Sequence, residues 1–216
     1  MISMFSLMLS LKILLSAVPL LLLSAFLVSY AAVGAGRTVR VMLDFFTNMP
    51  LIFPPMATGF LMVHFLGGEG AVGRMFKFDL MFTRTGLVIA AFIAGFPFIA
   101  QCMVNGVDAG LYRLCEASYS LGKGKTVTFF RVVIPSLKRN IISGMLLASA
   151  RILGEVGMSL MIGGNISGKT NTVSLEIYNA VLDGNNQQAF AFSLMLFIFS
   201  GSVFICIKML NYSESG

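Results

Sequence analysis

Long apolar stretches alternate with short polar segments along almost the whole chain. Four stretches are apolar over about 20 residues, the length that a helix needs to cross the hydrocarbon core of a bilayer. They are 13–33, 41–66, 85–106 and 189–207. A fifth stretch, 140–161, is apolar except for Arg151 and Glu155. This pattern predicts an all-α polytopic membrane protein with about five transmembrane helices in a single domain, residues 1–216.

Three prolines interrupt the second predicted span, at Pro50, Pro54 and Pro55. Each proline removes a backbone donor, so a regular helix cannot run through this segment. A broken helix is tolerated in a membrane only where protein or a water-filled cavity covers the freed backbone groups. Two interpretations stay open, a helix that begins after Pro55 and a kinked span that lines a cavity. The short distance from Pro55 to Gly67 favours the kink.

The composition agrees with a chain that lies in lipid. Hydrophobic residues make up 57% of the 216 residues and charged residues 11%, whereas soluble domains average about 25% charged residues. The net charge of +6 does not indicate nucleic acid, because the basic residues are spread between apolar stretches. Cys102, Cys115 and Cys206 have no C-x-x-C spacing and no nearby histidine, so we expect neither a disulfide framework nor a metal site.

Lysine and arginine are unevenly distributed between the two sides that five spans would create, and cytoplasmic loops carry the excess of these residues. The richer side holds Arg37, Arg40, Arg113, Lys123, Lys125, Arg131, Lys138, Arg139 and Lys208. The poorer side holds Arg74, Lys77, Arg84 and Lys169, with Lys12 at a span end. We therefore expect the amino terminus outside, and the carboxyl terminus and the segment 107–139 in the cytoplasm.

Two glycine-rich segments match nucleotide-binding motifs by their letters. Residues 163–170 read GGNISGKT, which satisfies the P-loop pattern, and residues 68–73 fit G-x-G-x-x-G. Both motifs require a strand before them and a helix after them in an α/β unit, and both segments fall in outer loops of the expected topology. We therefore expect no nucleotide or other cofactor to bind this chain, and no catalytic residue is apparent.

The polar segment 108–135 contains a short helix followed by a turn. The apolar face of the helix, which we expect to lie on the bundle, comprises Leu111, Leu114, Ser118 and Leu121. Glu116 and Tyr119 lie on the other, free face. Gly122 and Gly124 then allow the backbone to turn before the chain re-enters the membrane.

Within this segment, Glu116-Ala117-Ser118, Gly122 and Pro135 resemble the E-A-A, glycine and proline elements of the loop that defines permease subunits of binding-protein-dependent ABC importers. The resemblance implies the type I permease fold, in which this loop forms a cytoplasmic coupling helix that docks on an ATPase subunit. The ATPase-coupling residues would be Glu116, Ala117, Ser118, Leu121, Gly122 and Pro135.

The resemblance also implies partners and a location. Two cytoplasmic ATPase subunits would bind and hydrolyse ATP with magnesium, so the chain itself would not be an enzyme. A soluble binding protein would dock outside, and the membrane would be the cytoplasmic membrane of a bacterium or archaeon. We expect a second copy of the chain, because five helices are few to enclose a path and two-fold dimers are the commonest assembly.

Two further regions are similar to the molybdate branch of that family. One is Asn48-Met49-Pro50-Leu51-Ile52-Phe53-Pro54-Pro55, and the other is Ala150-Arg151-Ile152-Leu153-Gly154-Glu155-Val156-Gly157 followed by Gly164-Asn165-Ile166. Tungstate and sulfate permeases share parts of both patterns. The resemblance implies import of an oxyanion by alternating access, with molybdate favoured over tungstate and sulfate. An ion-coupled secondary transporter is the alternative of a different class, but it often carries an internal inverted repeat, and none is seen.

Arg151 and Glu155 are charged residues within the fourth predicted span. Arg151 would lie about 16 Å into the bilayer, and Glu155, four residues later, would share its helical face. Intramembrane charges are functional candidates by default, and we weigh a gating role evenly against a purely structural ion pair. The residues assigned to the translocation pathway or gate are Arg151, Glu155, Ser159 and Asn165. Replacing Arg151 with leucine should cut transport while the complex still assembles.

Overall fold

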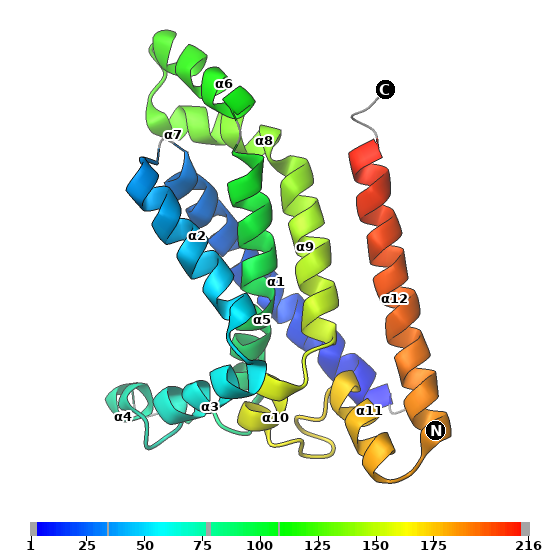
Figure 1. Cartoon of the computed structure of the whole chain (residues 1–216). Coiled ribbons are helices and arrows are strands. Elements are labelled where there is room, and N and C mark those ends of the chain that lie inside the picture. The colour runs from blue at the N-terminus through cyan, green and yellow to red at the C-terminus, as the bar shows by residue number, and fades with distance from the viewer. Residues whose placement is uncertain (1–3, 34, 77–78, 108, 213–216) are drawn as a thin grey trace.

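The computed structural model describes residues 4–33, 35–76, 79–107 and 109–212, and every regular element in these ranges is a helix. The order is α1 (Met4–Ala32), α2 (Arg37–Ile52), α3 (Pro55–Leu66), α4 (Ala71–Phe76), α5 (Arg84–Gly106), α6 (Ala109–Ser120), α7 (Lys125–Thr128), the π-helix η1 (Phe129–Val133), α8 (Ile134–Ser136), α9 (Lys138–Leu153), α10 (Gly157–Gly163), α11 (Val173–Leu182) and α12 (Asn186–Tyr212) (Figure 1). The predicted all-α fold is confirmed.

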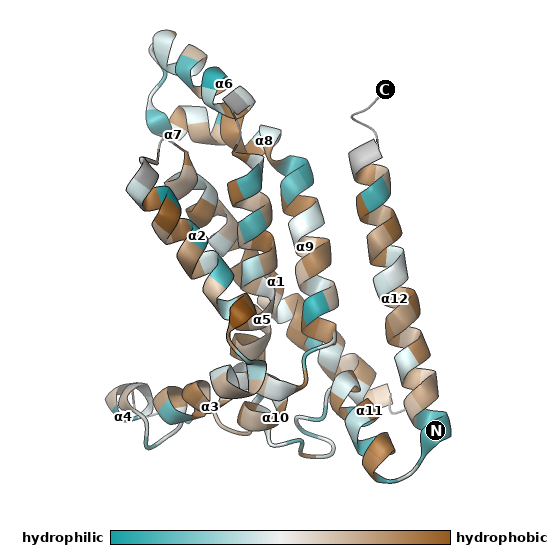
Figure 2. Ribbon diagram, viewed as in Figure 1, coloured by the Kyte–Doolittle hydropathy of each residue, from teal (hydrophilic) through white to brown (hydrophobic). Residues whose placement is uncertain are grey.

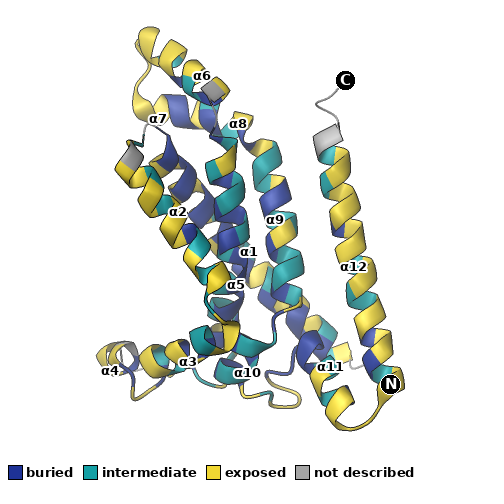
Figure 3. Cartoon of the chain, in the orientation of Figure 1, coloured by how far each residue is buried: buried dark blue, intermediate teal, exposed yellow. Residues whose placement is uncertain are grey.

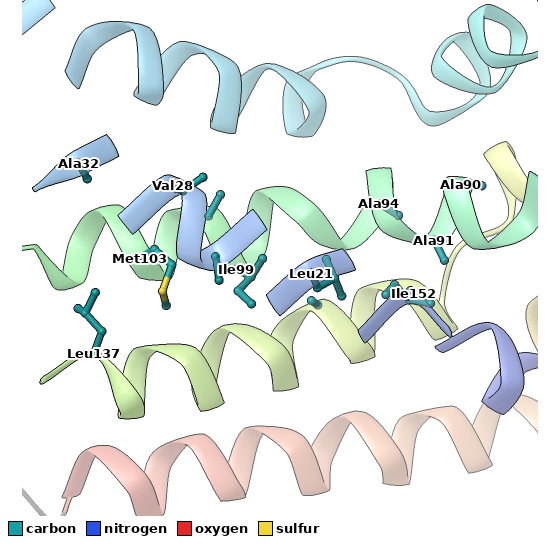
Figure 4. Close-up of a cluster of buried hydrophobic side chains, with 14 of the residues drawn as sticks. Leu21, Val28, Ala32, Ala90, Ala91, Ala94, Ile99, Met103, Leu137 and Ile152 are labelled. Carbon is teal, nitrogen blue, oxygen red and sulfur yellow. The ribbon is translucent and has the colours of Figure 1, made fainter. Parts of the chain in front are cut away.

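The core lies between α1, α5 and α9, and α5 has its most extensive contacts with α9 and α1. Leu21, Ile99 and Met103 point into this core and are fully buried (Figure 4). Small residues bring α5 and α9 close together. A Cβ added at Gly144 of α9 would stand only 3.0 Å from the Cα atom of Ile99 on α5. Small side chains at such crossings let membrane helices pack closely.

Within the described ranges, three helices, α1, α5 and α12, are long and apolar enough to cross a membrane, and the number rises to five if two bent pairs each form one span. Helix α12 is apolar along most of its length (Figure 2) and largely exposed (Figure 3). The first helix begins at Met4, nine residues before the predicted span. The five-span prediction thus depends on how the bent pairs are counted.

The second predicted span, 41–66, is not one kinked helix. Helix α2 ends at Ile52 and α3 begins at Pro55, and the axes of the two helices differ by 104°. The missing N–H groups of Pro54 and Pro55 explain where the helix ends, whereas Pro50 is accommodated inside α2. Helix α3 therefore turns across the end of the bundle, where it packs against α10 (Figure 1).

The fourth predicted span, 140–161, is also broken. Helix α9 ends at Leu153, α10 begins at Gly157, and the bend between them is 60°. Helices α3, α4 and α10 gather at one end of the molecule together with the start of α1, and α6 and α7 lie at the opposite end (Figure 1). The two ends therefore present different surfaces.

Candidate functional site

The tip at one end of the molecule consists of α6, a tight turn and α7. Gly122 has φ +74°, in the left-handed region. Its N–H group donates to the carbonyl oxygen of Tyr119 at 2.9 Å, and the N–H group of Lys123 donates to that of Ser118 at 3.1 Å. These two bonds form a Schellman motif, the usual way of ending a helix at glycine. The turn predicted at Gly122 is therefore present, and α6 ends there.

The face of α6 that contacts the bundle differs from the prediction. Leu111 and Cys115 are buried, and the Ser118 hydroxyl lies 2.8 Å from that of Thr128. Leu114 and Leu121, which were expected on this face, are exposed by 53% and 78%. Leu111, Cys115 and Ser118 are four and three residues apart, so they lie on one face of the helix. This buried face is rotated by part of a turn from the predicted one. Burial also raises the pKa of the Cys115 thiol above its ordinary value.

Most of the predicted coupling residues lie on the outer surface of this tip. Glu116 and Ala117 are exposed on α6, as is Leu121 just beyond it. Pro135 is exposed in α8, where the chain re-enters the bundle, whereas Ser118 bonds inward. Asp108, the first residue of the predicted loop, lies outside the described residues. The exposed apolar side chains of the tip are Leu114, Tyr119, Leu121, Val127 and Phe130.

Helix α6 is attached to the ends of three long helices through Arg40 and Tyr112. The Arg40 guanidinium donates to the carbonyl oxygen of Val107, at the end of α5, at 3.0 Å, and it lies 5.2 Å from the centre of the Tyr112 ring. The Tyr112 hydroxyl donates to the carbonyl oxygen of Ala32, the last residue of α1, at 3.1 Å. Helix ends leave such carbonyl groups without partners inside the helix. These contacts join α6 to α1, α2 and α5.

The sequence analysis did not predict this attachment, because it used Arg40 only to assign the cytoplasmic side of the membrane. A second contact of the same kind joins α7 to α1, where the Lys125 ammonium lies 4.8 Å from the centre of the Tyr30 ring. Tyr30 in turn packs edge-on against Phe129, at 5.1 Å between ring centres. Basic and aromatic residues near the ends of predicted spans could have indicated such contacts. The sequence does not show which of them pair, because the partners are far apart along the chain.

Replacing Gly122 with alanine should destabilise the α6–α7 turn by about 1–2 kcal/mol, because an L-residue is strained in the left-handed region. No atom of the described residues lies within 4 Å of the added Cβ, so we expect strain to cause the effect. Gly124→Ala is the matched control, since Gly124 has φ −70° and equally open surroundings. Thermal unfolding of the two purified variants in one detergent checks this prediction, and equal melting temperatures would contradict it.

Arg151 and Glu155 meet at the break between α9 and α10. Their side chains form an ion pair of 2.5 Å between Nη2 and Oε2, and they are 29% and 2% exposed. The other carboxylate oxygen of Glu155 accepts the Met158 N–H at 2.8 Å, in the first turn of α10. The predicted pairing is present, but Glu155 lies past the end of α9 and not on the same helix. One buried carboxylate thus joins the end of one helix to the start of the next.

Ser159 and Asn165, the other residues assigned to the pathway or gate, have different surroundings. Ser159 is buried on α10, which packs against α3. Asn165 has φ 51°, a left-handed conformation that asparagine tolerates, and exchanges side-chain hydrogen bonds of 2.6 and 3.2 Å with Asn179 of α11. Asn165 therefore belongs to a polar region between a loop and α11.

The segment 163–170 that resembles a P-loop is a closed loop in the structure. The Thr170 hydroxyl donates to the Gly163 carbonyl oxygen at 2.6 Å and accepts the Ile166 N–H at 2.9 Å. Helix α10 precedes the loop in place of a strand. A P-loop threonine has to face a magnesium ion, and this one is buried and bonded within its own loop.

Comparison with known proteins identifies similar chains. The family model described as "Binding-protein-dependent transport system inner membrane component" matches residues 22–212. The chain is 33% identical over 177 residues to "Probable transport system permease protein NifC" of Clostridium pasteurianum, which covers 81% of this chain and 62% of the relative. It is 37% identical over 137 residues to "Molybdenum transport system permease protein ModB" of Azotobacter vinelandii, covering 62% of this chain and 61% of the relative.

A more distant similarity connects the chain to a sulfate permease. "Sulfate permease 2, chloroplastic" of Chlamydomonas reinhardtii is 28% identical over 160 residues, which cover 73% of this chain and 43% of that protein. The matched region thus spans less than two thirds of the length of each of these relatives. The names of these relatives all describe transport permeases.

Proposed function

The chain belongs to the family of binding-protein-dependent transport system inner membrane components, and we propose that it is the permease subunit of an ATP-driven oxyanion importer. Molybdate is the favoured substrate, because a relative named as a molybdenum permease is 37% identical. Sulfate and tungstate are the alternatives within the same class, and the sulfate alternative is supported by a relative named as a sulfate permease.

The exposed tip is the observation that carries the energy-coupling part of the proposal. Leu121 and Phe130 are two of five large apolar side chains of the tip that are exposed, by 78% and 63%. Exposed apolar surface of this kind usually marks an interaction site. A cytoplasmic ATPase subunit would cover them. Its closure on ATP would move α6, and the contacts of Arg40 and Tyr112 would pass that movement to the long helices.

The same assignment orients the chain in the membrane. With α6 in the cytoplasm, the carboxyl end of α12 would lie on the cytoplasmic side and the start of α1 outside, since α6 and the start of α1 are at opposite ends (Figure 1). The binding protein would then meet this outer end around α11 and the start of α1 (Figure 1). A second copy of the chain would cover apolar surfaces that one copy leaves exposed, among them those of α2 and α12.

Reconstitution in lipid vesicles tests the proposed function. Uptake of radioactive molybdate is expected only when the ATPase subunits and the binding protein are both present. ATP must also be supplied on the side of the membrane where the ATPase subunits lie. Sulfate and tungstate in competition would rank the three anions. Uptake by the purified chain alone, driven by an ion gradient, would instead establish a secondary transporter.

Replacing Leu121 with aspartate should weaken association with the ATPase subunit about tenfold or more, because a charge would be buried in an apolar contact. The matched control is Met75→Asp on α4, at the opposite end of the molecule, since Met75 is 76% exposed and Leu121 is 78% exposed. Co-purification and titration of the ATPase subunit measure the effect. Equal affinities of the two variants would exclude Leu121 from the coupling surface.

A further inference from the structure

A polar pocket of about 470 Å³ is lined by residues of the start of α1 and of α11. These elements lie at the end of the molecule opposite α6 (Figure 1). Its walls come from the start of α1, the loop before α11 and one face of α11. The lining residues are Phe5, Ser6, Asn165, Ser167, Gly168, Asn171, Glu176, Asn179, Leu182 and Asp183. We call it the α11 pocket. Asn165 lines this pocket, whereas Arg151 and Glu155 do not.

The α11 pocket presents hydrogen-bond acceptors and negative charge. Glu176 and Asp183 contribute two carboxylates, and none of the described residues that line the pocket is lysine, arginine or histidine. Asn171 also lines it and is only 4% exposed, yet its Oδ1 atom accepts no hydrogen bond from any residue that the structure describes. Buried polar atoms normally have partners, so an acceptor without one indicates a missing donor. The pocket therefore fits a ligand that is positively charged and rich in N–H groups.

The spacing of the carboxylates argues against a metal ion. Glu176 lies on α11 and Asp183 follows its last residue, seven positions later, which separates the two by about 10 Å along the helix axis. Among the described residues, no three His, Cys, Asp or Glu side chains converge in a way that could hold a metal. An oxyanion is disfavoured as well, because both carboxylates would repel it. Two basic side chains, one for each carboxylate, can enter an open pocket of this size.

We propose that the α11 pocket receives lysine or arginine side chains of the extracytoplasmic binding protein. This inference rests on the proposed function, which places the pocket on the outer side of the membrane. Glu176 is already oriented by the Ser6 hydroxyl, which donates to its Oε1 at 2.8 Å. A carboxylate held in place by one donor is well suited to accept a second from a guanidinium. Docking there would contact α1, α11 and the loop after α10 together.

The test uses the permease–ATPase complex in lipid nanodiscs and the purified binding protein as the probe. The double variant Glu176→Gln and Asp183→Asn removes both charges but keeps the shapes, and glutamine can still accept the Ser6 bond. We expect its dissociation constant for the binding protein to rise about tenfold or more in low salt, with a weaker salt dependence. Glu69→Gln is the control, since Glu69 is an exposed carboxylate paired with Arg74 outside this pocket. It should bind as the wild type does.

Unchanged affinity and salt dependence in the double variant would overturn the inference. So would an equal loss of affinity in Glu69→Gln, because the effect would then reflect general charge and not this pocket. If spermidine stabilises the wild-type complex but not the double variant, while both bind the binding protein equally, the pocket serves a small polyamine and the proposal is wrong. A wild-type complex that binds no binding protein at all would instead contradict the proposed function.

Discussion

Arg151→Leu is expected to destabilise the chain by about 3–5 kcal/mol, because it leaves a buried carboxylate without its counter-charge. The Glu155 side chain is 2% exposed, and of its partners among the described residues it would retain only the Met158 N–H. Uptake should be lost as well, since a cation at the break would no longer be offered to the anion. The complex should still assemble, because α6 lies at the other end of the molecule (Figure 1). Thermal unfolding, ATPase co-purification and vesicle uptake measure these three properties.

The variant that replaces both Arg151 and Glu155 with leucine separates a structural pair from a gate. Replacing a buried ion pair with apolar residues of similar volume is often neutral for stability. We therefore expect the double variant to be more stable than Arg151→Leu but to remain inactive in uptake. Recovery of uptake together with stability would show that the pair only fixes the helix break. Glu155→Gln, which can still accept the Met158 N–H, tests the role of the charge in a milder way.

Gly144→Leu is expected to disrupt the packing of α9 against α5. Even a Cβ atom would stand 3.0 Å from the Cα atom of Ile99 and 3.1 Å from the Cβ atom of Cys102. The further atoms of leucine would push α9 away from α5, the most extensive helix contact in the molecule. Overpacking of this kind costs about 1–3 kcal/mol or more, and in a membrane no apolar driving force restores the contact.

Gly201→Leu on α12 is the matched control for Gly144→Leu. Gly201 also lies inside a helix, but nothing stands within 4 Å of its added Cβ. Gly201→Leu therefore makes the same change in helix propensity and side-chain size, but the new side chain enters open space. We expect a fall in melting temperature and in the yield of monodisperse protein for Gly144→Leu only. A fall of the same size in Gly201→Leu would show that the substitution acts through something other than α5–α9 packing.

Much of the fold follows from local features of the sequence. The apolar lengths of 85–106 and 189–207 correspond to α5 and α12 within a few residues at each end. The turn at Gly122 follows from one residue type, since glycine adopts positive φ without strain. The exposed position of Glu116 was also predicted correctly. Helical period and turn chemistry involve neighbours along the chain, so they can be read without knowing the path of the chain.

The face of α6 and the two helix breaks were harder to predict. Leucine at 114 and 121 suggested burial, but apolar character does not tell whether the bundle or another protein covers a side chain. The break at Phe53 was indicated by prolines, but the size of the bend was not. The break after Leu153 has no proline at all, and the four-residue spacing of Arg151 and Glu155 suggested a continuous helix in its place.

The amino-acid sequence was sufficient to establish the membrane class, the helical fold and the tip that carries the family resemblance. These depend on hydrophobic length, on helical period and on glycine at a turn, all of which are local. The tertiary structure decided how Arg40 and Tyr112 attach α6 to the bundle and how Glu155 joins two helices. It also brought Ser6 to Glu176 across 170 positions to form the α11 pocket. Such contacts depend on the path of the chain through space, because charge and hydrogen-bonding capacity do not specify a partner.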